Sequence, residues 1–237
     1  MSSSTRDKME AVILAGGKGT RLRSVVSDRP KALAPIGGVP FLYILLKYLA
    51  NKGFGRVVIS TGYLADQVIR AVGQQFDGMD ICCVREDSPL GTGGGLRLAL
   101  ESCHNDHVFV LNGDTFLDLD YHEAELFWQQ CRAPILIGCN VDDATRYGRL
   151  KISKGRVVAF TEKGNTGEGI INAGCYIIPT DLLSDFSIGE VFSFEQDFLQ
   201  QFVCKHDMYL LIAKGVFIDI GVPEDYDNAQ KLLKKYC

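Results

Sequence analysis

Apolar and polar positions alternate in a regular way through the first 140 residues. Glu10–Ala15 (EAVILA) contains a continuous apolar run that ends at glycines, which is typical of a strand buried inside a parallel sheet. Phe41–Lys52 has apolar residues at helical spacing and stops before Gly53. The same pattern predicts further strands and helices in alternation, over Arg56–Thr61, Tyr63–Phe76, Met79–Arg85, Gly91–Ser102, His107–Leu111, Tyr121–Cys131 and Pro134–Val141. Repeated strand–helix units predict an α/β fold with a Rossmann-like, mostly parallel sheet flanked by helices.

The pattern changes after Asp142. Short strand-like segments with glycine-containing connections predict a smaller, β-rich part built as a meander, over Arg149–Ile152, Arg156–Glu162 and Ile170–Ile178. A helix, two strands and a last helix are predicted to follow, over Phe194–Val203, Met208–Ala213, Val216–Ile220 and Pro223–Lys235. No linker separates the two parts, so we expect one domain over residues 9–237, with halves of about 9–141 and 142–237. The polar, serine-rich residues 1–8 are expected to form a disordered leader.

Composition and charge exclude several classes of protein. The 237 residues carry a net charge of −4, which argues against a generally basic surface for nucleic acid or membranes. No apolar run approaches the roughly 18 residues of a membrane span, and the polar N-terminus lacks a signal-peptide pattern. The eight cysteines show no CxxC spacing and most lie in apolar runs, so buried, reduced thiols in a cytoplasmic protein are expected. We therefore expect neither a nucleic-acid nor a membrane partner.

Positive charge and glycine are both concentrated in the sequence. Residues 1–31 carry seven Lys and Arg against three Asp and Glu. Seven of the 25 glycines fall in two short clusters, and the first lies in Leu14–Leu22 (LAGGKGTRL), directly after the first strand. A dinucleotide-binding fingerprint would need a third glycine where Leu22 stands, and a P-loop would need Ser or Thr directly after the lysine. The cluster therefore indicates a phosphate-binding loop of another kind, with Arg21 and Lys31 as its charges.

The first cluster together with Pro30–Ile36 (PKALAPI) resembles the signature of the sugar-1-phosphate nucleotidyltransferases, the nucleotide-sugar pyrophosphorylases. The resemblance covers residues 11 to about 228. It implies the nucleotide-diphospho-sugar transferase fold, with a nucleotide-binding first half and a sugar-phosphate-binding second half. The implied partners are a nucleoside triphosphate (NTP) and a sugar 1-phosphate, which react to give a nucleotide sugar and pyrophosphate.

The resemblance also assigns roles to the residues of the loop. Arg21 is expected to contact the departing pyrophosphate, and Lys31 the α and β phosphates. The segment that carries Lys31 is flanked by prolines and is expected to be extended, with little freedom. The loop residues expected to bind the nucleotide are Leu14, Ala15, Gly16, Gly17, Gly19 and Thr20.

Two acidic residues are candidates for a metal site. Asp114 ends the fourth strand in the segment LNGD, at the edge where open α/β sheets bind ligands. Asp219 interrupts an apolar strand, where a carboxylate is costly to bury without a partner. Its structural alternative is to cap the turn at Gly221. Carboxylates suit Mg²⁺, and the resemblance implies that Asp114 and Asp219 hold Mg²⁺ together.

The second glycine cluster lies in Glu86–Gly95 (EDSPLGTGGG) and resembles the base-recognition segment of the family. Gly91 and Thr92 are expected to lie near the nucleobase, and Glu86 to read its edge. Thymidylyl- and uridylyltransferases commonly have glutamine at the position of Glu86. An ionised carboxylate only accepts hydrogen bonds, and guanine offers two adjacent donors, so GTP is the favoured nucleotide. The structural alternative for Glu86 is a solvated loop acid.

The acceptor sugar is expected to lie against the second half of the chain. The resemblance implies that Lys163 binds the sugar phosphate and that Glu162 and Asn172 bind sugar hydroxyls. Lys163 suits this role because two anions must be brought together and their repulsion offset. Tyr63 is a candidate for the wall of the sugar pocket, with a role as a core aromatic equally open. Further residues expected at the sugar are Asn112, Gly113 and Gly174.

The compact chain is most similar to the D-glycero-α-D-manno-heptose 1-phosphate guanylyltransferases within this family. Mannose-1-phosphate guanylyltransferases are usually longer, with an added C-terminal domain that has no counterpart here. Two alternatives stay open within the family, a mannose-1-phosphate guanylyltransferase and a uridylyl-, thymidylyl- or cytidylyltransferase. A third alternative is a non-catalytic regulatory subunit on the same fold, and the oligomeric state is not fixed by the sequence.

Overall fold

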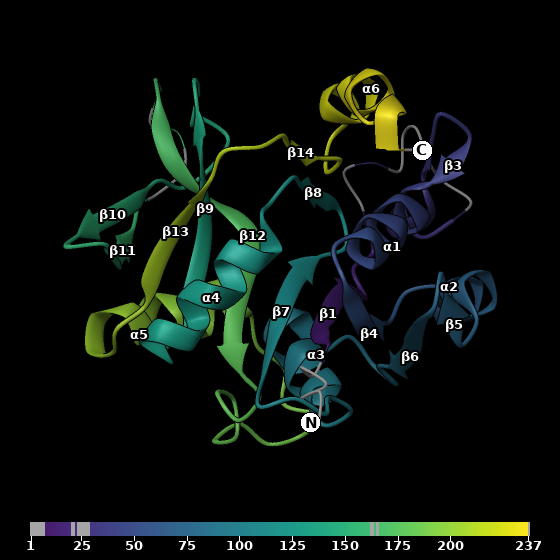
Figure 1. The fold of residues 1–237 in the computed structure, drawn as a ribbon, viewed down its shortest axis with the longest axis horizontal. Coiled ribbons are helices and arrows are strands. Elements are labelled where there is room, and N and C mark those ends of the chain that lie inside the picture. Colours follow the sequence, from purple (N-terminus) through teal and green to yellow (C-terminus); the bar gives the residue numbers. More distant parts are fainter. Residues whose placement is uncertain (1–7, 20–21, 23–28, 162–163, 165, 237) are drawn as a thin grey trace, which may run out of the picture.

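The computed structural model describes residues 8–19, 22, 29–161, 164 and 166–236. Within these ranges the chain forms one ten-stranded mixed sheet (Figure 1). In spatial order its strands are β10 (Leu150–Ser153), β11 (Arg156–Phe160), β13 (Tyr209–Ala213), β9 (Ile135–Val141), β12 (Gly169–Pro179), β7 (His107–Asn112), β1 (Met9–Ala15), β4 (Phe54–Thr61), β6 (Met79–Arg85) and β5 (Gln75–Phe76). The predicted leader falls almost wholly outside the described residues.

Four neighbouring strands of the sheet, β7, β1, β4 and β6, are parallel, as the sequence pattern predicted. β1 lies between β4 and β7 and is parallel to both, and β6 continues the parallel set beyond β4. β12, which comes from the second half of the chain, is inserted antiparallel between β7 and β9. Beyond β9 the sheet continues through β13, parallel to β9, and ends in the antiparallel β10–β11 hairpin. The two halves of the sequence therefore share one continuous sheet.

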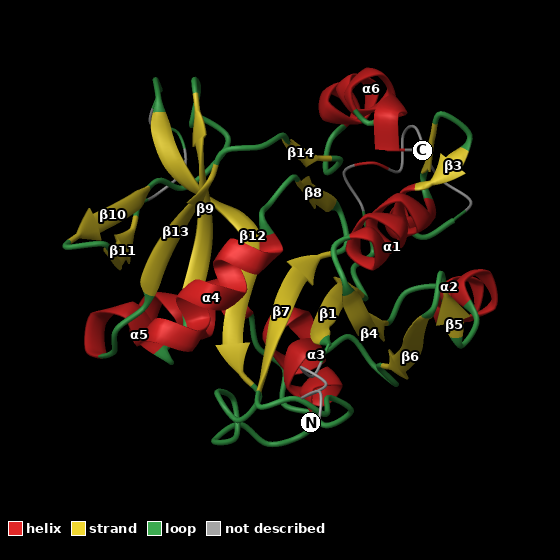
Figure 2. Cartoon of the chain, viewed as in Figure 1, coloured by secondary structure: helices red, strands yellow, loops and turns green. Residues whose placement is uncertain are grey.

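Helices cover both faces of this sheet (Figure 2). Along β1, Ala11 and Ile13 belong to the apolar cluster on one face and Val12 to the cluster on the other, and all three are fully buried. Strands buried on both faces need apolar residues at every position, which explains the continuous run. The first face is covered by α1 (Phe41–Asn51), α2 (Ala65–Val72), α4 (Tyr121–Cys131) and α6 (Pro223–Leu232). The second is covered by α3 (Gly91–Leu100), the π-helix η3 (Phe194–Leu199) and α5 (Gln200–Lys205).

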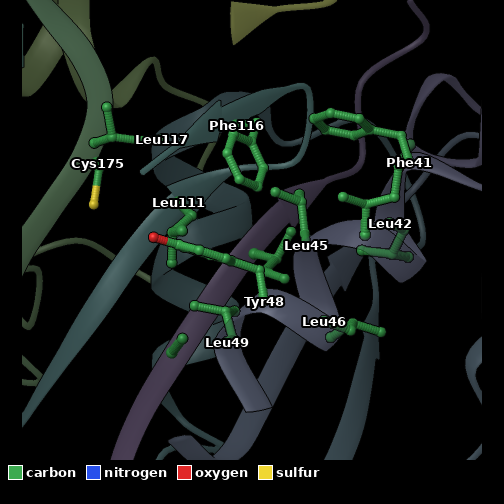
Figure 3. Packing of buried hydrophobic residues seen from close by; sticks show 14 of the residues in the cluster. Phe41, Leu42, Leu45, Leu46, Tyr48, Leu49, Leu111, Phe116, Leu117 and Cys175 are labelled. Carbon is green, nitrogen blue, oxygen red and sulfur yellow. The ribbon is translucent and has the colours of Figure 1, made fainter. Parts of the chain in front are cut away.

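α1 supplies much of the core on the first face. Its buried residues pack with side chains of β7, of the segment after it and of β12 (Figure 3). The Tyr48 ring lies 4.9 Å from that of Phe116, and its hydroxyl donates a hydrogen bond of 2.6 Å to Asp118. The buried phenol therefore keeps a polar partner at the end of the core.

Several boundaries differ from those predicted by the sequence pattern. The helix expected over Tyr63–Phe76 is shorter, because Gly73 ends α2 with a φ of 65° and the chain returns as β5. The C-terminal helix ends at Leu232 and is followed by the 3₁₀ turn η4 (Lys234–Tyr236). Two small antiparallel ladders are also present, β2 (Pro35–Ile36) with β3 (Val39–Pro40), and β8 (Thr115–Leu117) with β14 (Phe217–Asp219). β14 lies within the strand predicted over Val216–Ile220, whereas β2, β3 and β8 were not predicted.

The segment around Lys31 is not extended, so that prediction was wrong. Lys31–Leu33 forms the 3₁₀ helix η2, with the Leu33 amide donating to the Pro30 carbonyl at 2.9 Å. A proline before a helical turn is compatible with it, because its fixed φ suits the start of a helix. The second proline acts on the other side, since it keeps Ala34 in an extended conformation and ends the turn.

Two absences hold for the part of the chain that the structure describes. The seven cysteines within it are all free, and only Cys139 and Cys175 of these are buried, so the expectation of buried thiols was wrong for the other five. No helix in that part is both long and apolar enough to cross a membrane.

His107 begins β7 at the amino edge of the sheet, and its imidazole lies between two carboxylates. Its Nδ1 is 2.5 Å from Asp106 and its Nε2 is 2.9 Å from Glu125. The ring stacks on Trp128, the single tryptophan of the chain, with centroids 4.8 Å apart. Burial lowers the pKa of His107, but the hydrogen bonds to Glu125 and Asp106 outweigh this effect and leave the pKa above its ordinary value.

A raised pKa in the folded state makes the contribution of His107 depend on pH. The imidazolium stabilises the fold fully below the ordinary histidine pKa of 6.5, and this stabilisation is lost as pH rises through the raised folded value. We expect His107→Gln to lower the free energy of unfolding by about 1–2 kcal/mol at pH 5.5 and by clearly less at pH 9. Urea unfolding followed by Trp128 fluorescence measures this, with His122→Gln as control, because His122 is exposed on α4, the helix that carries Glu125 and Trp128. An equal loss at both pH values would contradict the assignment.

Candidate functional site

Two adjoining cavities open at the carboxyl ends of β1, β4 and β7. The larger has a volume of about 610 Å³ and the smaller about 180 Å³, and both are lined by Leu14, Gly17 and Asp114. Loops after parallel strands meet at this edge, which is where open α/β sheets bind ligands. The nucleotide residues predicted from the two glycine clusters that line one or both cavities are Leu14, Ala15, Gly16, Gly17, Gly19, Glu86, Gly91 and Thr92.

The Lys31 ammonium lies between the two predicted metal-binding acids. Its Nζ is 2.5 Å from Asp114 Oδ2 and 3.9 Å from Asp219 Oδ1. The Lys31 side chain is only 11% exposed, so this contact is better shielded than a surface ion pair. The structure thus brings together three charged residues that lie far apart in the sequence.

The ladder formed by β8 and β14 explains why the two acids meet. Thr115, the first residue of β8, is paired with Asp219, the last residue of β14. Asp114 directly precedes β8, and its carbonyl accepts a hydrogen bond of 2.9 Å from the Ile220 amide. The pairing register therefore places both residues at the end of one short ladder. This ladder lies beside the end of β7 (Figure 1).

Asp219 also caps the turn at Gly221, the structural role that was its alternative to metal binding. The Gly221 amide donates a hydrogen bond of 2.7 Å to Asp219 Oδ1, which caps the turn into α6. A Cβ at Gly221 would lie 2.7 Å from Asp219 Oδ1 and 3.1 Å from Lys31 Nζ. Capping and charge pairing therefore act together, because the turn holds the carboxylate next to the ammonium.

The first glycine loop passes over the same lysine. Gly19 has a φ of 56° and a Cβ there would lie 2.9 Å from Lys31 Cβ, so both backbone conformation and space favour glycine. A Cβ at Gly17 would meet nothing within 4 Å and would point into open space. The loop is thus packed on Lys31 at Gly19 and open toward the cavities at Gly17.

Glu86 lines the larger cavity, and its carboxylate is held by the protein. Oε1 accepts a hydrogen bond of 3.1 Å from the Ser60 hydroxyl, and Oε2 accepts one of 3.0 Å from the Leu90 amide. Glu86 is therefore not a freely solvated loop acid. Ser60 was missed by sequence reasoning, because a serine near the end of an apolar strand carries no distinctive signal.

Most of the second glycine cluster serves a close packing contact. A Cβ at Gly91 would lie 2.4 Å from the Phe192 carbonyl oxygen, and one at Gly93 would lie 2.2 Å from the Phe192 ring. At Gly94 the nearest atom would be the Glu190 carbonyl oxygen, also at 2.2 Å. The Phe192 carbonyl accepts a hydrogen bond of 2.9 Å from the Gly93 amide and so satisfies a donor at the start of α3.

Thr92 connects this glycine cluster to the second half of the chain. Its hydroxyl donates a hydrogen bond of 2.8 Å to Glu195 and accepts one of 2.9 Å from the Phe194 amide. Glu195 in turn contacts the hydroxyl of buried Tyr176. Glu195 was not predicted, since an acid in a polar helix resembles any solvated residue.

The predicted sugar residues of the described chain meet where β7 and β12 pair. Asn172 accepts a hydrogen bond of 3.0 Å from the Gly174 amide and donates one of 2.6 Å to Tyr176. A Cβ at Gly174 would lie 2.5 Å from Asn112 Nδ2, so the two strands are in close contact there. The Asn112 side-chain oxygen is buried and has no hydrogen-bond partner within the described structure. Such an atom is a candidate to accept a hydrogen bond from a ligand.

Four predicted site residues lie outside the described residues. Two others, Gly113 and Tyr63, are held by backbone hydrogen bonds to the first glycine loop. Gly113 donates to the Leu14 carbonyl at 2.9 Å, and Tyr63 donates to the Gly16 carbonyl at 3.1 Å, so both line the cavities from short turns. The residues outside the described ranges are Thr20, Arg21, Glu162 and Lys163.

The sequence and fold match a known family. A family model described as nucleotidyl transferase matches residues 10–235. The chain belongs to the nucleotidyl transferase family. This confirms the family and the fold that the two glycine clusters indicated.

Among relatives of this nucleotidyl transferase, the D-glycero-alpha-D-manno-heptose 1-phosphate guanylyltransferase of Aneurinibacillus thermoaerophilus is 40% identical, over 96% of this chain and 100% of the relative. Crystal structures of HddC from Yersinia pseudotuberculosis, one complexed with GMP-PN, match with a TM-score of 0.86 at 39% identity, over 95% of this chain and 100% of HddC. The mannose-1-phosphate guanylyltransferase of Mycobacterium tuberculosis is 32% identical over 92% of this chain but only 63% of the relative.

The open space at Gly17 allows a test of where the nucleotide lies. Gly17→Ala adds a methyl group where it meets no protein atom, so we expect the thermal unfolding midpoint to stay the same or rise slightly. Because the methyl enters the cavities, the KM for the nucleoside triphosphate should rise roughly tenfold. Steady-state pyrophosphate release measures this, with the KM for the sugar phosphate as internal control. An unchanged KM for the triphosphate would show that the ligand does not approach this backbone.

Proposed function

We propose that this nucleotidyl transferase moves GMP from GTP to D-glycero-α-D-manno-heptose 1-phosphate, with release of pyrophosphate. The observation that carries the proposal is that Glu86 and Asp114 line one cavity, so a base-reading acid and a phosphate-side acid face the same space. Relatives named for this activity are 38–40% identical over nearly the whole chain, which supports the choice of both substrates.

The reaction needs positioning and charge stabilisation more than proton transfer. An oxygen of the sugar phosphate attacks the α-phosphorus in line, forming a new P–O bond as the bond to the pyrophosphate oxygen breaks. The attacking oxygen of the sugar phosphate is already ionised at neutral pH, so no general base is required. The protein contributes by holding the two anions in line and by balancing their charge.

Asp114 and Asp219 are the residues that would hold Mg²⁺. They already hold a cation, the Lys31 ammonium, and carboxylate oxygens suit a hard ion. Within the described residues no group of three or more His, Cys, Asp or Glu side chains is arranged for a metal, so phosphate and water oxygens would complete the shell. The ion would supply neutralisation of the charge on the transferring phosphate.

In this proposal Lys31 serves both the acids and the phosphates. Its ammonium has three donors, and its side chain lies under the glycine loop at Gly19. We expect it to contact the α and β phosphates, with Arg21 at the leaving pyrophosphate and Lys163 at the sugar phosphate. In the same proposal the buried side-chain oxygen of Asn112 accepts a hydrogen bond from a sugar hydroxyl. The other residues around the sugar are Gly113, Glu162, Asn172 and Gly174.

Mannose 1-phosphate is the second candidate acceptor, because mannose-1-phosphate guanylyltransferases are 29–33% identical to the chain. A regulatory protein without activity is less well supported. It would not need the contact of Lys31 with Asp114 and Asp219, and the structure keeps all three together. A cytoplasmic location is part of the proposal and is supported by the free thiols of the described cysteines.

A substrate panel tests the proposed specificity. Pyrophosphate release is measured with GTP, CTP, UTP, dTTP and ATP, each with heptose, mannose and glucose 1-phosphates. We expect the highest kcat/KM for GTP with the heptose, because Glu86 accepts two hydrogen bonds from guanine and only one from uracil or thymine. Highest activity with UTP or dTTP would refute the base assignment, and release with no pair would favour the regulatory alternative.

Asp114→Asn tests the phosphate side of the site. The amide keeps the shape of the side chain but removes its charge, and we expect kcat/KM to fall roughly 10²–10³-fold with the fold intact. Asp118→Asn is the matched control, because Asp118 lies just past β8 and bonds to Tyr48 and Tyr236 instead of Lys31. That variant should lose stability but keep activity. Near-normal activity in Asp114→Asn would remove this residue from the mechanism.

A further inference from the structure

Ser60 has a buried hydroxyl for which the proposed function gives no role. It lies in β4, one residue before the strand ends, and is 1% exposed. Few polar residues of the described chain are as buried, and this one also lines the larger cavity. Its hydroxyl donates to Glu86 Oε1 at 3.1 Å. A buried polar group with a single carboxylate partner is a candidate for orienting that partner.

Two glycines make the space in which this carboxylate lies. A Cβ at Gly16 would be 2.3 Å from Glu86 Oε1, and one at Gly95 would be 2.8 Å from the same atom. The Cβ at Gly95 would also lie 3.0 Å from Ser60 Oγ. We call this space the carboxylate slot, defined by Gly16, Ser60 and Gly95. Each glycine cluster supplies one wall of it, and the Ser60 hydroxyl supplies its hydrogen bond.

The other carboxylate oxygen is held by the chain that follows. Oε2 accepts a hydrogen bond of 3.0 Å from the Leu90 amide, and the Glu86 amide donates one of 2.8 Å to the Thr61 carbonyl. Each oxygen therefore has one protein donor. A carboxylate has about four acceptor positions, so two remain for a ligand.

We propose that Ser60 is a positioning residue that sets base specificity by fixing the plane of the Glu86 carboxylate. This rests on the proposed function, in which Glu86 accepts hydrogen bonds from N1–H and N2–H of guanine. The terminal torsion of a glutamate is broad, so a carboxylate held at one oxygen only can rotate. Accepting two donors at once requires a fixed plane, and a group that is fixed beforehand loses less freedom on binding.

Inosine triphosphate is the probe for this proposal, because hypoxanthine keeps N1–H and lacks the 2-amino group. The quantity measured is the ratio of kcat/KM for GTP to that for inosine triphosphate. In the wild type this ratio should be about tenfold or more, as expected for a lost hydrogen bond to a charged group. Glu86→Gln should reduce it, since an amide accepts at only one atom.

Ser60→Ala should reduce the same ratio roughly tenfold through a higher KM for GTP, with kcat changed by less than about twofold. In a Glu86→Gln background, Ser60→Ala should leave the ratio unchanged, because the hydroxyl acts through the carboxylate. Thr61→Val is the matched control. It removes the neighbouring buried hydroxyl, which donates to the Val84 carbonyl at 3.0 Å, and should lower stability without changing the ratio.

The outcomes separate this inference from the proposed function. If Glu86→Gln leaves the ratio unchanged, the guanine assignment of Glu86 fails and the role of Ser60 fails with it. If Glu86→Gln lowers the ratio and Ser60→Ala does not, only the inference is overturned. It is also overturned if Thr61→Val lowers the ratio as much as Ser60→Ala, or if Ser60→Ala lowers kcat for both nucleotides equally.

Discussion

Two carboxylates held at one edge of a sheet repel each other unless a cation lies between them, and the site is organised around this requirement. Asp114 and Asp219 are brought together by the short β8–β14 ladder, and Lys31 supplies the charge between them. The lysine is placed by a 3₁₀ turn between two prolines, and the glycine loop after β1 packs directly on it. The phosphate side of the site therefore depends on three separate segments meeting around one ammonium group.

The sheet connects this charged centre to the rest of the cavity. Because β12 is inserted between β7 and β9, Gly174 lies against the Asn112 side chain at the end of β7, and Asn172 accepts a hydrogen bond from the Gly174 amide. The second glycine cluster lets the segment around Phe192 pack against the start of α3. An overall net charge of −4 is compatible with a polyanionic substrate, since lysines and arginines are concentrated in residues 1–31, which contain the phosphate-binding loop.

The sequence predicted the parallel strands of the first half well, because strands buried on both faces and amphipathic helices carry strong patterns. β6 and α4 were predicted with their observed bounds. β14 was predicted, but its partner β8 was missed, since a strand of three residues carries almost no periodic signal. The turn at Lys31 was wrongly predicted to be extended. A proline disfavours the helical conformation only for the residue before it, which is Ala34 here, and it leaves the residues after Pro30 free to form a helical turn.

The candidate site was predicted in part, and the reason differs from residue to residue. Asp114, Asp219 and Lys31 were predicted from motifs, but their mutual contact depends on tertiary pairing that spacing does not reveal. The glycines were predicted at the ligand, whereas Gly93 and Gly94 make room for Phe192 and Glu190. Ser60 and Glu195 were missed, because their residue types are common and only their partners in space distinguish them.

We propose above that Asp114 and Asp219 together would hold Mg²⁺ beside the nucleotide. Isothermal titration with a non-hydrolysable GTP analogue, with and without Mg²⁺, tests it most directly in the wild type and in the Asp114→Asn, Asp219→Asn double variant. We expect Mg²⁺ to tighten binding to the wild type by about tenfold or more and to have little effect on the double variant. Equal tightening in both proteins would contradict it.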